Sequence, residues 1–135
     1  MNSVFLLSGK TLCIRRLKER DLQQCYYELM SLLSDTDRSI LRIRHTLDSL
    51  ENEHIYFVIE DMNTQMIVGT CSIIITNVNS KISQTGYIEN IMIRKDYENI
   101  GLGDKIFQHV KYYCMNTKHC IHIEINCEIN NIYTK

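Results

Sequence analysis

The sequence predicts a mixed α/β fold of the α+β class, formed as a single domain over residues 1–135. Segments with strand-like alternation are interspersed with segments in which apolar residues recur at the helical period. A length of 135 residues suits one domain with a hydrophobic core of its own. Apolar residues make up 44% of the chain and charged residues 23%, and this balance excludes wholesale disorder.

The first half of the chain is expected to contain a strand, two helices and a second strand. Residues 11–16 alternate well enough for the first strand, and Asp21 is expected to cap a helix that continues to the polar stretch 34–37. A second helix is predicted over about 38–50, and a short apolar strand over 55–60.

The second half is expected to add three strands and one helix. The predicted elements are a hairpin turn over 61–65, strands over 66–77 and 87–93, a helix over about 103–115 and a strand over 120–127. Gly69, inside the first of these strands, indicates a β-bulge or a close approach of neighbouring backbone. The predicted order is therefore β-α-α-β-β-β-α-β.

The net charge and the cysteines limit the cellular compartment and the classes of binding partner that we expect. The formal net charge of -1 argues against nucleic acid, and no apolar run approaches the roughly 18 residues of a membrane span. The six cysteines form no C-x-x-C pair, and the first ten residues lack the features of a signal peptide. We expect a cytoplasmic protein with free thiols that binds neither nucleic acid nor a membrane.

Other ionisable residues carry no chemical signal of their own. The basic residues between positions 10 and 20 are interrupted by Glu19 and Asp21, which favours a solvated corner between strand and helix. His109 and His122 do not form a metal-binding pair, and we expect each to be a surface or hydrogen-bonded histidine. No metal is expected.

The informative stretch runs from Tyr87 to Gly103. A predicted strand ends, a polar turn follows, and Gly101-Leu102-Gly103 opens an apolar helix. Helix N-termini carry unpaired N–H groups and partial positive charge, and glycines let backbone approach a phosphate. Glycines that serve only the turn are the alternative. The Lys and Ser/Thr of a Walker loop and the third glycine of a Rossmann fingerprint are absent.

This arrangement and the predicted element order resemble the acetyl-CoA motif of the GNAT acyltransferase superfamily. Within it, Cys13–Leu17 and Tyr87–Ile91 are similar to the glucosamine-6-phosphate N-acetyltransferases, and the resemblance runs from about residue 11 to about residue 131. It implies the GNAT fold, with a central mixed, mostly antiparallel sheet flanked by helices. The family continues into a final helix and strand, which we expect to be missing because the sequence stops at Lys135.

The resemblance implies an acetyl-CoA-dependent N-acetyltransferase without a metal. In this family, acetyl passes directly from acetyl-CoA to the 2-amine of glucosamine 6-phosphate. The family's pantetheine contacts fall on Ile91, Met92 and Ile93. Its pyrophosphate contacts fall on five turn and helix residues: Asn99, Ile100, Gly101, Gly103 and Asp104.

The resemblance places the acceptor sugar at Glu89 and Asn90, with Ser34 as a further contact. A carboxylate at position 89 can orient the amine or accept its proton through water. The family also supplies a tyrosine that protonates the leaving thiolate. With a short gap in the alignment this acid is Tyr133; without a gap, Asn131 matches a cofactor-binding asparagine and the sequence stops before the tyrosine.

Two departures from the family leave alternatives open. Asn90 stands where the family usually has Asp, and Glu98 stands where the motif usually has Gln or Arg. The chain could therefore acetylate another small amine or a protein amine, or hold coenzyme A without catalysis. The edge of the strand over 120–127 is expected to be covered by a second copy, giving a homodimer.

Overall fold

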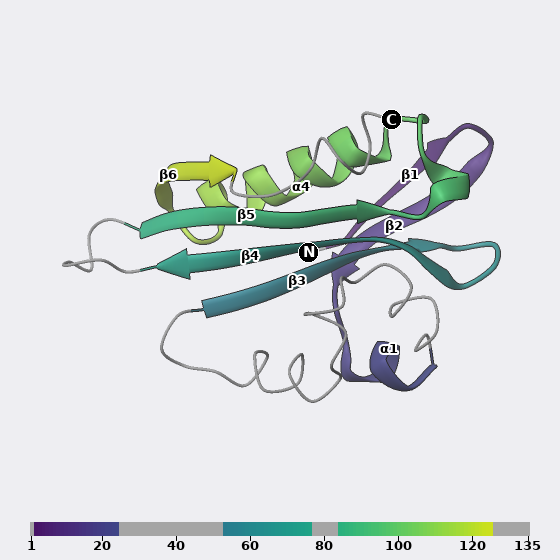
Figure 1. Cartoon of the computed structure of the whole chain (residues 1–135), viewed down its shortest axis with the longest axis horizontal. Helices are drawn as coiled ribbons and strands as arrows, with labels where there is room; N and C mark the ends of the chain where they lie inside the picture. The colour runs from purple at the N-terminus through teal and green to yellow at the C-terminus, as the bar shows by residue number, and fades with distance from the viewer. Residues whose placement is uncertain (1, 25–52, 77–83, 126–135) are drawn as a thin grey trace.

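The computed structural model describes residues 2–24, 53–76 and 84–125, except for the side chains of Leu22, Gln23, Gln24, Glu53, Glu89 and Asn90. These residues form a six-stranded sheet with the strands in chain order (Figure 1). The strands are β1 (Ser3–Leu7), β2 (Lys10–Arg16), β3 (Glu53–Asp61), β4 (Met66–Thr76), β5 (Gln84–Ile93) and β6 (Cys120–Ile125). All neighbours are antiparallel except β5 and β6, which are parallel. The predicted mixed, mostly antiparallel sheet is confirmed.

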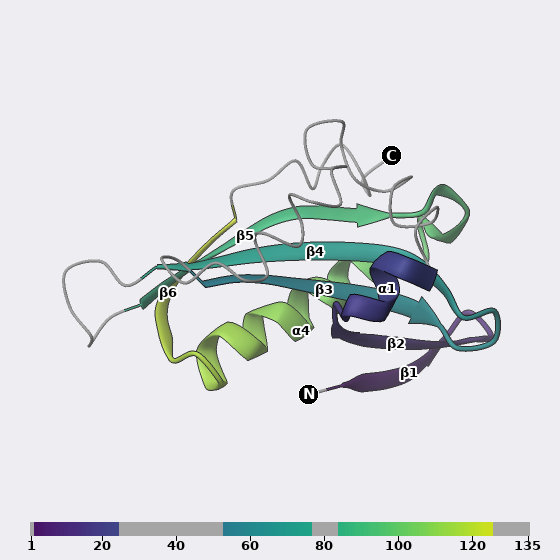
Figure 2. The ribbon, with the colours of Figure 1, turned by 90° about the horizontal axis from the view of Figure 1, so that it is seen from below.

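Helix α4 (Leu102–Asn116) provides the main cover of the sheet. Figures 1 and 2 show it on one side of the sheet, with the short helix α1 (Glu19–Gln24) on the other. The α4 residues Ile106 and Val110 are fully buried in one core cluster with residues of the sheet such as Phe57 and Ile73. The helical period of apolar residues predicted over 103–115 therefore corresponds to the face of α4 that is buried against the sheet. No helix among the described residues is long and apolar enough to cross a membrane.

Strand β1 was not predicted from the sequence. It pairs with β2 through a tight turn at Ser8 and Gly9, whose φ angles of 51° and 76° suit a two-residue hairpin. Val4 and Leu6 are exposed, while Phe5 packs against the core. Because apolar residues occupy both faces of β1, the period of two is hidden in the sequence.

Helix α1 begins at Glu19, so the expectation that Asp21 caps it was wrong. Asp21 lies in the first turn, where its carboxylate accepts the backbone N–H of Lys18 at 2.8 Å, as in the second half of a capping box. The predicted continuation of this helix beyond residue 24 and the predicted helix over 38–50 lie outside the described residues.

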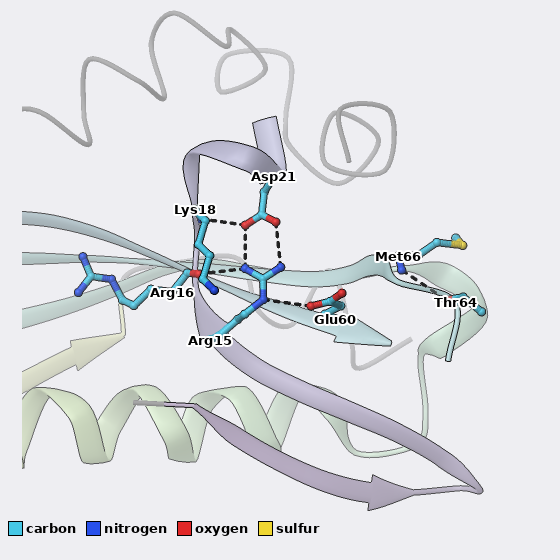
Figure 3. Close-up of polar contacts among 7 residues, drawn as sticks. All are labelled: Arg15, Arg16, Lys18, Asp21, Glu60, Thr64 and Met66. Carbon is cyan, nitrogen blue, oxygen red and sulfur yellow. Dashed lines mark hydrogen bonds and ion pairs between the residues drawn. The ribbon is translucent and has the colours of Figure 1, made fainter. Parts of the chain in front are cut away.

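The prediction of a solvated basic corner was also wrong for Arg15. Its side chain is only 4% exposed, and it donates two hydrogen bonds of 2.8 Å to the carboxylate of Asp21 (Figure 3). A third bond, of 3.1 Å, goes to Glu60 on β3. The guanidinium thus ties α1 to the sheet, and its two carboxylates make its burial tolerable.

The β3–β4 hairpin is confirmed, with its turn at residues 62–65. Its register shifts between Ile59 and Glu60, where β4 carries one extra residue beside Gly69. A Cβ at Gly69 would lie 2.8 Å from Cδ1 of Ile59 and 3.0 Å from Cδ1 of Ile93. Gly69 therefore marks both the bulge and the close packing that the sequence indicated.

A second irregularity divides β5 into two halves. Thr70 pairs with Met92 and Ser72 with Glu89, so three steps along β5 oppose two along β4. The extra residue reverses the side-chain alternation. Ile88 before it and Ile91 after it both belong to the core cluster, although three positions separate them.

The described cysteines agree with the expectation of free, buried thiols. Cys13, Cys71, Cys114 and Cys120 are buried and form no disulfide. Where α4 and β6 meet β5, a Cβ at Gly86 would lie 3.1 Å from Sγ of Cys114 and 3.3 Å from Sγ of Cys120. Gly86 thus provides the space that the two thiols fill.

Candidate functional site

The candidate site begins where β5 ends. The chain leaves Ile93, forms the 3₁₀ turn η1 (Lys95–Tyr97) and enters α4 through residues 98–101. Asn99 and Gly101 both have left-handed backbone, with φ angles of 66° and 90°. Asparagine and glycine adopt this region at low cost, so these two residues allow the tight reversal into the helix.

Gly101 is the N-cap of α4, and no side chain caps the helix start. The N–H of Lys105 donates to the carbonyl of Gly101 at 3.1 Å, which begins the ladder of helical bonds. The N–H groups of the first turn have no acceptor within the helix. Together with the helix dipole they make this end of α4 suited to an anion.

A cavity of about 270 Å³ lies at this point. Its lining includes four of the five residues expected at a pyrophosphate, namely Asn99, Gly101, Gly103 and Asp104. The fifth, Ile100, instead packs against the core. The remaining lining residues are Ile93, Tyr97, Glu98 and Leu102.

The role of Tyr97 was missed in the sequence. Its ring is buried, and its hydroxyl donates a 2.5 Å hydrogen bond to Asp61 at the end of β3. The ammonium of Lys10 lies 5.5 Å from the centre of the same ring. Tyr97 lies within the stretch from Tyr87 to Gly103, but its partner Asp61 is 36 positions away, and no local pattern links the two residues.

The pKa values of the two groups in this hydrogen bond are shifted in opposite directions. Burial and the bond to Asp61 raise the pKa of Tyr97 to about 12. Burial alone would raise the pKa of Asp61, but hydrogen bonds from Tyr97 and from backbone amides outweigh it and lower that pKa. The pair is therefore a neutral phenol that donates to a carboxylate at neutral pH.

The charges around the cavity do not by themselves attract an anion. Two lining residues, Glu98 and Asp104, carry carboxylates. Arg94 is close in sequence, but it pairs with Asp96 at 3.1 Å. Binding of a diphosphate here would therefore depend on the backbone amides and the helix field, with the two carboxylates opposing it.

The second half of β5 presents backbone groups, rather than side chains, for contact with a ligand. Ile91 and Ile93 are buried in the core, and Met92 is half-buried. The described pairing with β6 stops at Ile88 and Ile125. Beyond that point, the described residues pair with β5 only from the β4 side, as a ligand that adds as a strand would require.

The structure brings together only part of the expected acceptor site. Glu89 and Asn90 lie at the irregularity of β5, directly before Ile91–Ile93. Their side chains lie outside the described part of the structure. Ser34, Asn131 and Tyr133 also lie outside the described residues. Their predicted contacts and roles stay predictions.

The residues present fit a coenzyme A diphosphate. Gly101 is exposed, and a Cβ placed on it would have no heavy atom within 4 Å, so its backbone borders open space. The half of β5 over Ile91–Ile93, the turn without a side-chain cap and this open glycine follow one another along the chain. Each provides backbone groups, which suits a ligand held by its diphosphate and by an amide-containing arm.

The sheet with its divided β5 and the glycine turn that opens α4 define an acyltransferase fold that uses acyl-CoA. The chain belongs to the acetyltransferase (GNAT) family, whose model matches residues 16–134. It is thus an acetyltransferase, and this family uses acetyl-CoA. No protein with a curated description matches the chain.

Solved structures with this fold include enzymes with different acceptors. A glucosamine-6-phosphate N-acetyltransferase from Arabidopsis thaliana is 20% identical, with a TM-score of 0.70 over 90% of this chain and 86% of that one. An aminoglycoside N-acetyltransferase in complex with CoA is 16% identical, with a TM-score of 0.67 over 90% and 80%. A ribosomal-protein-alanine N-acetyltransferase from Brucella melitensis is 15% identical, with a TM-score of 0.66 over 86% and 80%. At these identities the likeness shows the fold alone.

Proposed function

We propose that this protein transfers acetyl from acetyl-CoA to the 2-amine of glucosamine 6-phosphate, giving N-acetylglucosamine 6-phosphate and CoA. The observation that carries the proposal is the order of features along β5 and the turn after it. An irregularity at Glu89 and Asn90 precedes the half-strand Ile91–Ile93, which leads to the cavity at Gly101. The acceptor, the acyl group and the coenzyme would then lie one after another along β5 and the turn that follows it.

The coenzyme would be held mainly by backbone. Its pyrophosphate would lie on the turn amides from Asn99 to Asp104, with Gly101 giving the closest approach. Its pantetheine arm would run along the backbone of Ile91–Ile93, whose outer two side chains are fixed in the core. This arrangement would bring the thioester towards the irregularity in β5.

The chain's own residues would then handle the proton and the leaving group. Glu89 would orient the sugar amine or accept its proton through water, and Asn90 and Ser34 would contact the sugar. Tyr133 would hydrogen-bond to the departing thiolate and protonate it; the free thiol has a pKa near ~8.5 and a tyrosine near ~10, so the two values are close enough for a positioned donor. In the ungapped alignment, Asn131 instead contacts the coenzyme.

The acceptor rests on the resemblance of residues 13–17 and 87–91 and is supported by the likeness to the Arabidopsis enzyme. A different amine is the second candidate. Structures of aminoglycoside and ribosomal-protein acetyltransferases fit the chain almost as well, with TM-scores of 0.67 and 0.66 against 0.70.

We further propose a cytoplasmic homodimer. Ile121 and Ile125 on β6 are 73% and 53% exposed, and both lie on a strand that could pair with a second copy. Light scattering at working concentration tests the dimer, and a strict monomer would contradict it.

The deciding experiment measures acetyl transfer over an acceptor panel. Purified protein is mixed with acetyl-CoA and glucosamine 6-phosphate, glucosamine, an aminoglycoside or a peptide with a free amino terminus. Formation of N-acetylglucosamine 6-phosphate is followed by mass spectrometry, because the six cysteines of the chain would add to a thiol assay. Turnover of glucosamine 6-phosphate well above the other acceptors supports the proposal.

Two other outcomes have distinct meanings. Preferred turnover of another amine would overturn the acceptor and keep the reaction. Binding of acetyl-CoA in calorimetry without turnover of any acceptor would mean that the natural acceptor is not in the panel, and would also overturn the proposed substrate. Glu89→Gln serves as the matched variant, since it keeps the size of the side chain and removes the charge; unchanged turnover in it would exclude Glu89 from the acceptor site.

A further inference from the structure

A second cavity, of about 390 Å³, lies between α4 and the edge strand β1. It shares no lining residue with the cavity at the start of α4. On the helix, Lys105, His109 and Tyr112 form one stripe, at the spacing i, i+4, i+7. Phe5 on β1 and Ile14 on β2 provide an apolar wall, so the cavity combines an apolar body with a polar rim.

The charge in this cavity is unbalanced. Lys105 is the one formally charged side chain among its lining residues if His109 is neutral, and no carboxylate lines it. The ammonium of Lys105 lies 5.3 Å from the centre of the Phe5 ring and forms no ion pair with any residue in the described part of the chain. Burial lowers the pKa of His109, which leaves the imidazole neutral at pH 7.

His109 is a second unusual feature of this cavity. Its ring packs edge-on against Phe57, with the ring centres 5.3 Å apart. Its Nε2 atom is closed to solvent and has no hydrogen-bond partner among the described residues, which corrects the expectation of a satisfied or surface histidine. A buried polar atom without a partner is unfavourable, and a phenylalanine could pack on Phe57 without that cost.

We propose that this cavity binds a small amphipathic carboxylate with an aromatic or short aliphatic body. The apolar part would lie against Phe5 and Ile14, and the carboxylate would pair with the ammonium of Lys105. The volume lies in the range of small-molecule sites. This binding does not depend on the proposed acetyl transfer.

Benzoate is the probe, and benzamide is its neutral counterpart of nearly the same shape. Ligand-observed NMR titrations compare the two with the full-length protein. Benzoate is expected to bind at least five-fold more tightly than benzamide. Lys105→Met, which keeps the length of the side chain, should weaken benzoate about five-fold and leave benzamide unchanged.

Lys111→Met is the matched control, because Lys111 is an exposed lysine of α4 outside this cavity. It should leave both affinities unchanged. Equal binding of benzoate and benzamide, or a loss of benzoate binding as large in Lys111→Met as in Lys105→Met, overturns the proposal. Displacement of benzoate by coenzyme A also overturns it, since the two cavities would then be one site. Circular dichroism of each variant excludes loss of fold.

Discussion

The hydroxyl of Tyr97 and the carboxylate of Asp61 are joined by a hydrogen bond of 2.5 Å, and both residues are buried. Asp61 ends β3, where it also accepts the backbone N–H of Asn63 at 2.9 Å, and Tyr97 lines the cavity at the start of α4. The bond therefore fixes the glycine turn against the β3–β4 hairpin. It makes the shape of the cofactor cavity depend on a residue outside the motif.

Tyr97→Phe removes this bond and keeps the ring. We expect a loss of about 1–3 kcal/mol in the free energy of unfolding, because a buried carboxylate loses a donor. The KM for acetyl-CoA should rise, while the KM for the acceptor stays unchanged, since the turn is displaced and β5 is not. Steady-state kinetics and denaturant titrations measure the two effects. An equal rise in both KM values would mean a general loss of structure.

The same pair predicts a pH dependence at the alkaline end. The pKa of Tyr97 is raised to about 12, so its contribution to stability is complete below its unfolded value of 10.0 and is lost as the pH rises towards 12. The difference in unfolding free energy between wild type and Tyr97→Phe should thus be constant near neutral pH and shrink between these values. A constant difference up to pH 12 would contradict the assignment.

Gly101→Ala tests the cofactor cavity. The left-handed backbone should cost about 1–2 kcal/mol with an alanine, and the new Cβ would occupy the open space that a diphosphate needs. Gly9→Ala is the matched control, with φ of 76° against 90° and equally open surroundings, in the β1–β2 turn. Both variants should lose similar stability, and only Gly101→Ala should bind coenzyme A more weakly in calorimetry. Similar affinities in the two would remove the diphosphate from this position.

Glu98→Gln should tighten coenzyme A. Glu98 lines the cavity, and its charge opposes a diphosphate. Because the side chain is only partly buried, the gain should be at most about 1 kcal/mol, or roughly five-fold in Kd. Glu124→Gln, on the exposed part of β6, controls for net charge. An unchanged or weaker affinity in Glu98→Gln would show that the carboxylate points away from the ligand.

Asp21→Asn should destabilise the fold by about 3–5 kcal/mol, since among the described residues it leaves the buried charge of Arg15 with Glu60 as its one carboxylate partner. Burial opposes ionisation of Asp21, but hydrogen bonds from Arg15 and Lys18 outweigh it and lower its pKa. Its contribution is therefore present above the unfolded pKa near 3.8 and is lost as the pH falls through the lowered value. In a double-mutant cycle, Arg15→Met should recover part of the loss; strict additivity would rule out the coupling.

Tyr133→Phe tests the proposed acid. If Tyr133 protonates the thiolate, turnover should fall about 100-fold with little change in the KM for acetyl-CoA, as is typical of a positioned proton donor. Single-turnover kinetics over a pH range make the measurement. Full activity in this variant would support the ungapped alignment, in which Asn131 contacts the coenzyme.

The sequence predicted those features whose signals are local. The helix over 103–115 and the turn with Gly101 are set by residues within a few positions of one another, and both were found within a residue or two. Arg15 was expected in solvent although its main partner, Asp21, lies only six positions away, because Asp21 was read as an interruption of the basic cluster. The second carboxylate, that of Glu60, lies 45 positions away and leaves no trace in the local charge pattern. Tyr97 and Asp61 escaped notice for the same reason. Strand β1 was hidden by its apolar outer face.

The irregularity in β5 has a consequence for how this protein can change in evolution. Ile88 and Ile91 both contact the core because one residue is inserted between two otherwise regular half-strands. Deletion of a single residue at position 90 would turn every later side chain of β5 over, exposing Ile93 and forcing Met92 into the core. Substitutions along this strand can therefore accumulate one at a time, whereas its length is fixed, and its two halves can diverge only by exchange of side chains.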